Sequence, residues 1–138
     1  YQLGDRIQLL GYDLNSTTFH AGDRVELNLY WYTTGAVPYG YATFVHISNG
    51  GPPLAQADKQ NPSGRPTVKW TSDGFIIDPY SISLPADMPA GEYQIMVGLY
   101  TCDTRPAGEC GNGERLLVRD EAGADLGDAV PLVTITVR

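Results

Sequence analysis

The sequence is poor in cationic residues and in long apolar runs. It has nine Lys and Arg against sixteen Asp and Glu, a formal net charge of −7. Neutralising nucleic-acid phosphates requires clustered Lys and Arg, and anionic membrane surfaces repel an acidic chain. No apolar run approaches the roughly 20 residues that span a bilayer. We therefore expect no nucleic-acid partner and no direct membrane insertion by this segment.

Residues that support nucleophilic catalysis are scarce. The chain has two histidines, and it lacks the GxSxG turn that exposes a catalytic serine. His46 lies in the strand-like segment ATFVHIS, on the face of Phe44, where a bond to Gln56 or Asp58 would satisfy its ring. We therefore expect a structural role for His46, no enzymatic activity and no cofactor.

Carboxylates are abundant, but most of them fall in turns. A glycosidase needs two carboxylates on opposite sides of a cleft, whereas an Asp in a turn bonds its own backbone. A solvated turn acid is the default interpretation of the following carboxylates, most of which occupy turns: Asp73, Asp78, Asp87, Asp103, Glu109, Glu114, Asp120, Glu121, Asp125 and Asp128.

One acidic segment, RDEAGADLGD, is a weak candidate for calcium. It gathers oxygen ligands of the kind that Ca²⁺ prefers, on Asp120, Glu121, Asp125 and Asp128. The acids lack the alternate spacing and the final bidentate Glu of an EF-hand loop. A plain solvated hairpin is the preferred interpretation, and we expect no metal site.

The clearest pattern in the chain is alternation with a period of two. In EYQIMVGLYTC the residues Tyr93, Ile95, Val97 and Leu99 share one face, which indicates a strand with one side in a core. No segment shows comparable helical periodicity. The predicted strands cover residues 5–14, 24–33, 41–48, 54–58, 75–84, 92–101, 114–120 and 132–138.

Short strands separated by Gly and Pro turns are typical of a two-sheet sandwich. The sequence thus predicts an all-β, immunoglobulin-like, antiparallel β-sandwich, with residues 1–138 forming one domain. Trp31 shares a face with Val25, Leu27 and Leu29, so we expect it in the core.

The two cysteines frame the short polar segment CDTRPAGEC. Pro106 and Gly108 allow this segment to turn, so a disulfide between Cys102 and Cys110 is the preferred interpretation, and it implies an oxidising compartment. Two free thiols are an alternative. Half of a zinc site is another, although His20 and His46 are distant in sequence.

Aromatic residues suggest a binding surface. Sugar-binding sandwiches stack pyranose rings on exposed Trp and Tyr. Trp70 lies in the long connection KQNPSGRPTVKWTSDG, and tyrosines 30, 32, 39 and 41 cluster around one hairpin. The candidate ligand contacts are Trp70, Lys69, Asp73, Tyr39 and Tyr41. The alternative, which we favour for Trp70, is that its indole turns inward and plugs the edge of the sandwich.

Several segments of the sequence resemble those of a known group of domains. They are GDRIQLLGYDL, AGDRVELNLYWY, ATFVHI, AQAD, PTVKW, DPYSISLPADMPAGEYQIMVGLY, ERLLV and LGDAVPL. Together they resemble the extracytoplasmic β-sandwich domains at the C-terminus of multi-spanning membrane proteins. Those proteins are similar to dolichyl-phosphate-mannose-type glycosyltransferases and occur notably in Chloroflexi-like bacteria. The segment CDTRPAGECGNG departs from the pattern, so the resemblance gives the disulfide no support.

The resemblance implies an accessory module of a cell-envelope glycosyltransferase-like protein. Its expected partners are neighbouring domains of a parent membrane protein, or cell-envelope glycan. Its expected location is extracytoplasmic, tethered through a segment not present here. The alternative is a self-associating structural subunit of a cell-surface or envelope assembly, because exposed sheet edges pair readily.

Overall fold

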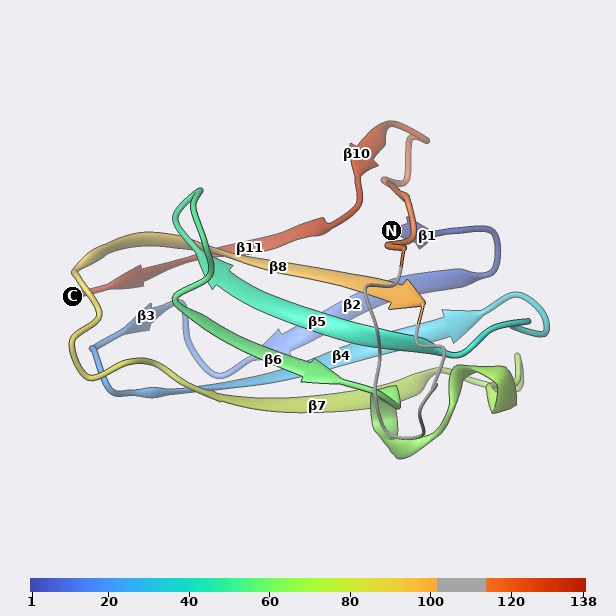
Figure 1. The fold of residues 1–138 in the computed structure, drawn as a ribbon, viewed down its shortest axis with the longest axis horizontal. Helices are drawn as coiled ribbons and strands as arrows, with labels where there is room; N and C mark the ends of the chain where they lie inside the picture. Colours follow the sequence, from blue (N-terminus) through green and yellow to red (C-terminus); the bar gives the residue numbers. More distant parts are fainter. Residues whose placement is uncertain (102–113) are drawn as a thin grey trace.

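A computed structural model describes residues 1–101 and 114–138 of the chain, and its strands form two sheets packed face to face (Figure 1). Within these residues the first sheet has the order β10 (Asp125–Gly127), β9 (Val118–Arg119), β1 (Gln2–Leu3), β2 (Ile7–Leu14), β4 (Arg24–Thr33), β7 (Ile76–Ser83). The second has the order β3 (Thr18–Phe19), β11 (Val130–Val137), β8 (Gly91–Thr101), β5 (Tyr41–Ser48), β6 (Ala55–Lys59). The prediction of an all-β sandwich is confirmed.

The core lies between the two sheets and follows the alternation of the long strands. On β4, Val25, Leu27, Leu29 and Trp31 are all buried, as the sequence pattern predicts. On β8 the same holds for the odd-numbered positions from 93 to 99. Burial of these apolar side chains, at roughly 25 cal/mol per Å² removed from water, supplies the main driving force for the sandwich.

The N-terminal strands connect the two sheets. β2 pairs antiparallel with β4 in the first sheet, and after a short turn β3 pairs parallel with β11 in the second. All the other strand pairs among the described residues are antiparallel. A bulge between Leu9 and Gly11 interrupts the β2–β4 register and turns the end of β2.

The long connection between β6 and β7 contains two short 3-10 turns, η1 (Pro62–Gly64) and η2 (Thr67–Lys69). Both lie at the end of the sandwich where β6 and β7 meet (Figure 1). Ser63 has a positive φ of 64°, and the backbone N–H groups of Gly64 and Arg65 donate to the carbonyls of Asn61 and Pro62. The connection therefore has a defined backbone conformation that its own hydrogen bonds hold.

Cys102 and Cys110 lie outside the described residues, as do Asp103 and Glu109. Within the described residues, no helix has the length and the apolar character needed to cross a bilayer.

Candidate functional site

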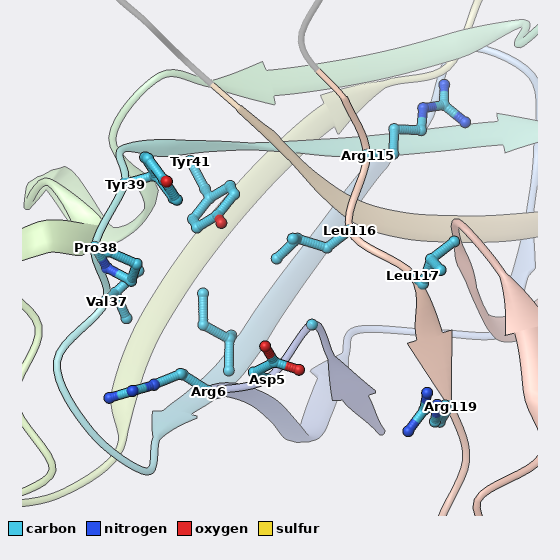
Figure 2. A pocket seen from close by; sticks show the side chains of 12 residues that line it. Asp5, Arg6, Val37, Pro38, Tyr39, Tyr41, Arg115, Leu116, Leu117 and Arg119 are labelled. Carbon is cyan, nitrogen blue, oxygen red and sulfur yellow. The ribbon is translucent and has the colours of Figure 1, made fainter.

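A cleft of about 450 Å³ opens at one end of the sandwich, beside Tyr39 and Tyr41 (Figure 2). The connection from β4 to β5 contributes Val37, Pro38 and Tyr39, β5 begins with Tyr41, and Gly4–Arg6 of the β1–β2 turn form another wall. The segment before β9 completes the lining. The residues around the cleft are Gly4, Asp5, Arg6, Ile7, Val37, Pro38, Tyr39, Tyr41, Arg115, Leu116, Leu117 and Arg119.

The two tyrosines are held by a buried threonine of η2. The hydroxyl of Thr67 donates to the carbonyl of Tyr39 at 2.8 Å and accepts the backbone N–H of Tyr41 at 2.9 Å. The two rings meet edge to face, with centroids 6.5 Å apart and an interplanar angle of 81°. Tyr39 is 60% exposed, whereas Tyr41 is half-buried. Tyr39 and Tyr41, both candidate contacts from the sequence, therefore lie against each other at the cleft.

Charged groups surround this aromatic pair. Asp5 lies in the β1–β2 turn that borders the cleft, and Arg6, Arg115 and Arg119 also line it (Figure 2). Arg6 donates to the carbonyl of Ala36 at 3.3 Å, and Arg115 lies 3.5 Å from Asp128. Burial raises the pKa of Tyr41, and the nearby Tyr39 and Asp5 add to this rise, so its hydroxyl stays protonated at neutral pH. The cleft therefore presents aromatic faces together with donors and acceptors.

Trp70 takes the inward orientation. Its side chain is 3% exposed, its Nε1 donates to the carbonyl of Arg65 at 3.1 Å, and its ring centroid lies 6.3 Å from that of Trp31. A ligand cannot stack on a buried indole, so the structure removes Trp70 from the candidate ligand contacts. Lys69 and Asp73 are exposed on either side of it and do not line the cleft.

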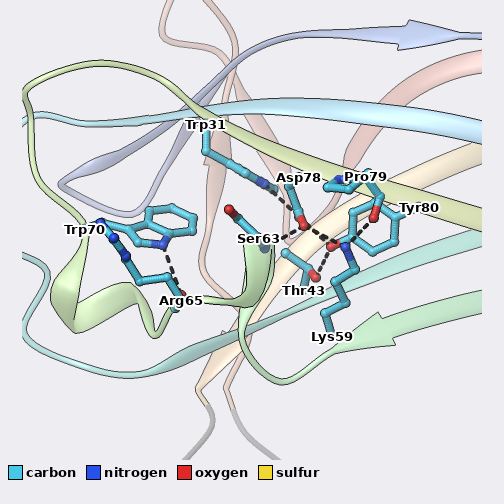
Figure 3. Close-up of polar contacts among 9 residues, drawn as sticks. All are labelled: Trp31, Thr43, Lys59, Ser63, Arg65, Trp70, Asp78, Pro79 and Tyr80. Atoms are coloured by element: carbon cyan, nitrogen blue, oxygen red, sulfur yellow. Dashed lines mark hydrogen bonds and ion pairs between the residues drawn. The ribbon is translucent and has the colours of Figure 1, made fainter.

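The carboxylate of Asp78 accepts four hydrogen bonds from its neighbours in the core (Figure 3). It is 0% exposed, which corrects the interpretation of Asp78 as a solvated turn acid. Its Oδ2 accepts Trp31 Nε1–H at 3.1 Å and the Tyr80 hydroxyl at 2.6 Å. Its Oδ1 accepts Lys59 Nζ at 3.0 Å and the backbone N–H of Ser63 at 2.7 Å.

The surroundings of Lys59 and Tyr80 complete this cluster. Lys59 Nζ also donates to the carbonyl of Pro79 and lies 4.2 Å from the centroid of the Tyr80 ring. The Tyr80 hydroxyl shares a further hydrogen bond with Thr43. Burial strongly raises the pKa of Tyr80, and Asp78 adds to this rise, so the phenol remains a donor. Among the described residues no buried side-chain nitrogen or oxygen lacks a hydrogen-bond partner, and the bonds of this cluster join β6, β7 and η1.

A signal for Asp78 was present in the sequence. In FIIDPYSISL, Asp78, Tyr80 and Ile82 are alternate residues, so their side chains point to the same face of the strand. Tyr80 and Ile82 are both buried. A carboxylate at an inward position of a strand predicts a buried partner, since an unpaired buried charge is costly. Lys59 carries no such signal, because it ends a short edge strand.

His46 lies on the outer face of the second sheet and is half-buried. Its Nε2 is 3.8 Å from Asp58 Oδ1, and its ring centroid is 4.8 Å from that of Phe44. Burial lowers the pKa of His46 and Arg115 lowers it further, while Asp58 acts in the opposite direction. Of the two partners expected from the sequence, Gln56 lies directly opposite His46 on β6, and Asp58 is the one within ion-pair distance.

The acidic segment after β9 uses its carboxylates on its own backbone. Asp120 Oδ1 accepts the N–H groups of Ala122 and Ala124, each at 2.9 Å, and Asp125 Oδ1 accepts that of Gly127 at 2.8 Å. Asp128 faces Arg115 instead, and Glu121 is exposed. Within residues 1–101 and 114–138, no group of three or more acidic, His or Cys side chains is placed to hold a metal. The segment forms a hairpin, because β9 and β10 pair antiparallel.

No protein-family model matches the chain, and no curated protein is significantly similar to it in sequence.

Proposed function

We propose that this domain is a non-catalytic, extracytoplasmic accessory module of a cell-envelope glycosyltransferase-like protein, and that it contacts glycan through the Tyr39–Tyr41 cleft. The observation that carries the proposal is the 60% exposure of Tyr39 at the margin of a cleft of about 450 Å³. Its partners would be cell-envelope glycan and neighbouring domains of the parent protein. The order of the strands, with β3 parallel to β11, supports the immunoglobulin-like form of the sandwich.

The lining of the cleft suits a sugar. The face of a pyranose carries C–H groups that pack on aromatic rings, while its edge carries hydroxyls that need donors and acceptors. Tyr39 supplies an exposed ring, Asp5 an acceptor and Arg119 a donor, all within one concave surface. Most small-ligand sites combine an apolar wall with a few polar groups in this way.

Titration of the domain with oligosaccharides released from a bacterial envelope tests the proposal. We expect Tyr39→Ala to weaken binding about tenfold, and Tyr12→Ala, an exposed tyrosine outside the cleft, to leave it unchanged. Equal binding by the wild type and Tyr39→Ala would contradict a role for the cleft. The sequence encoded immediately upstream provides a second test, because membrane-spanning helices there would support the accessory role.

The alternative is a self-associating structural subunit. β7 lies at the edge of its sheet, which is the position from which strands pair between molecules. Pro79 stands in the middle of β7 and provides no N–H donor, which disfavours pairing along this edge. Size-exclusion chromatography with light scattering separates the two functions, since a monomer at high concentration would contradict assembly.

A further inference from the structure

The outer face of the first sheet carries a band of aromatic and apolar side chains, two of them half-buried tyrosines and two of them exposed. Tyr30 and Tyr32 alternate with the buried Leu29 and Trp31, so they point away from the core. Ile77, the neighbour of Tyr30 on β7, is 51% exposed, and Phe75 immediately before β7 is 59% exposed. Together these four side chains, Tyr30, Tyr32, Phe75 and Ile77, form what we call the aromatic band.

Contacts within the protein fix the geometry of the aromatic band. The Tyr30 and Phe75 rings meet edge to face, with centroids 5.8 Å apart and an interplanar angle of 73°. The Tyr32 hydroxyl donates to the carbonyl of Ser72 at 3.4 Å, which holds the loop before Phe75 beside β4. On the other side, Gly11 of β2 lies opposite Tyr30, and the space above it is open. The band is therefore preformed, and its flank over Gly11 is open.

Polar groups lie directly beside the aromatic band. The next row of the sheet places Asp13, Asn28 and Pro79 side by side. Asp13 Oδ2 accepts the Tyr30 hydroxyl, and among the described residues no hydrogen bond occupies Asp13 Oδ1 or the Asn28 amide. An aromatic surface bordered by a free acceptor and a free amide fits a molecule that has C–H faces and hydroxyl edges.

The charge of this face selects the class of sugar. The carboxylates of Asp13 and Glu26 lie in successive rows, and the guanidinium of Arg24 beside them donates to the Ser81 hydroxyl. The whole chain carries a net charge of −7. Uronic acids, phosphates and sulfates would be repelled, whereas an uncharged glycan has no such penalty.

We propose that the aromatic band binds an uncharged, extended oligosaccharide by stacking, with Asp13 and Asn28 bonding its hydroxyls. The proposal deepens the glycan-contacting function inferred above and places it on a second surface, separate from the Tyr39–Tyr41 cleft. A band that extends from β4 to β7 suits consecutive sugar rings in a straight chain, whereas the cleft suits a chain end or a branch.

Isothermal titration calorimetry with cellohexaose, an uncharged and straight oligosaccharide, tests the proposal. An aromatic contact of this kind contributes about 0.5–1.5 kcal/mol, or up to roughly tenfold in affinity. We expect Phe75→Ala and Tyr32→Ala each to weaken binding three- to tenfold, and Asn28→Ala to weaken it less. Phe75 is exposed, so its replacement should leave folding intact, which unfolding by urea would verify. An oligogalacturonate of equal length should bind at least tenfold more weakly than cellohexaose.

Two matched variants keep this proposal separate from the function proposed for the cleft. Loss of cellohexaose binding in Phe75→Ala but not in Tyr39→Ala would support the aromatic band. The reverse pattern would overturn the band and leave the cleft as the glycan site. Absence of cellohexaose binding by the wild type, or a Phe75→Ala effect confined to self-association, would also overturn it, and binding of other glycans at the cleft would be unaffected.

Discussion

The Nζ atom of Lys59 lies 3.0 Å from Oδ1 of Asp78, and the two residues come from the edge strands of opposite sheets. Asp78 is fully buried, while the Lys59 side chain is 31% exposed. Trp31, Tyr80 and Ser63 bond the same carboxylate, so its charge is compensated by one cation and three further donors. This contact closes one side of the sandwich with a polar cluster where apolar packing is the usual solution.

Removing either partner of this pair should destabilise the fold. Lys59→Met leaves a buried carboxylate without its cation, and Asp78→Asn leaves the ammonium without its anion, so we expect each to cost about 3–5 kcal/mol. The double variant should cost at least about 1 kcal/mol less than the sum, because the two groups interact directly. Urea denaturation measures all four free energies of unfolding, and simple additivity would contradict coupling.

The fluorescence of both tryptophans should not respond to added glycan. Trp31 and Trp70 are 0% and 3% exposed, so the wild-type protein should show blue-shifted emission that acrylamide quenches poorly. Glycan should leave that emission unchanged, and Trp70→Ala should cost about 3–5 kcal/mol of stability. A red emission maximum that shifts with ligand would instead place one indole in water.

His46 should make stability dependent on pH in a defined direction. Its pKa is lowered in the folded protein, so the unfolded chain binds the proton more readily. The neutral His46 ring makes its full contribution to the free energy of unfolding above the ordinary pKa of about 6.5. That contribution is lost as the pH falls through the lowered pKa of the folded protein. His46→Gln should lower the melting temperature at pH 7, leave ligand binding intact, and flatten the dependence of stability on pH as the pH falls below about 6.5. An unchanged slope would contradict this role.

Gly98 should tolerate no side chain. A Cβ at this position would lie 2.2 Å from Cε2 of Phe44 and 3.1 Å from the carbonyl oxygen of Asp128. Phe44 is itself covered by the Arg115 guanidinium, 4.2 Å from its centroid, so the ring has little freedom to move. We expect Gly98→Ala to cost about 1–3 kcal/mol in thermal or urea unfolding.

Gly11 provides the matched control for this prediction. It also lies in a strand, but an added Cβ would meet no atom within 4 Å. Gly11→Ala should therefore be neutral or slightly stabilising. A similar loss in both variants would point to a general effect of replacing glycine in strands, and would contradict the specific role of the Phe44 ring.

A disulfide between Cys102 and Cys110 stays a prediction from the sequence. A bridge that closes so short a segment contributes roughly 2–3 kcal/mol in the chain-entropy model. Alkylation of the folded, unreduced protein followed by intact mass measurement should show no added label. Two labels per chain would show free thiols.

The long strands could be predicted from sequence because their alternation is strong. The ranges 24–33 and 41–48 agree with β4 and β5, and 92–101 differs from β8 by one residue. β1, β3 and β10 were missed, since two or three residues carry no periodicity and their pairing is set by the rest of the fold. Residues 114–120 were predicted as one strand, but only Val118–Arg119 of that segment form β9.

The candidate site was predictable only in part. Tyr39 and Tyr41 were found because they are neighbours along the chain, and they line the cleft together. The cleft is also lined by Asp5, Arg6 and Arg115, which come from other segments of the chain. No local sequence pattern predicts that these segments lie side by side. Tyr30 and Tyr32 were noticed, but Phe75 was not, because its contact with Tyr30 depends on the β4–β7 register.

The position of the cleft relative to Arg138 affects how binding should be measured. The Gly4–Arg6 turn lines the cleft, whereas Arg138 bonds to Phe19 beside β3, at the opposite end of the longest axis (Figure 1). A biotin or surface anchor attached after Arg138 would thus hold the cleft away from a sensor chip. The same anchor attached before Tyr1 would bring that end toward the support and hinder large glycans sterically. A difference in apparent affinity between the two orientations would itself report which end of the sandwich receives the ligand.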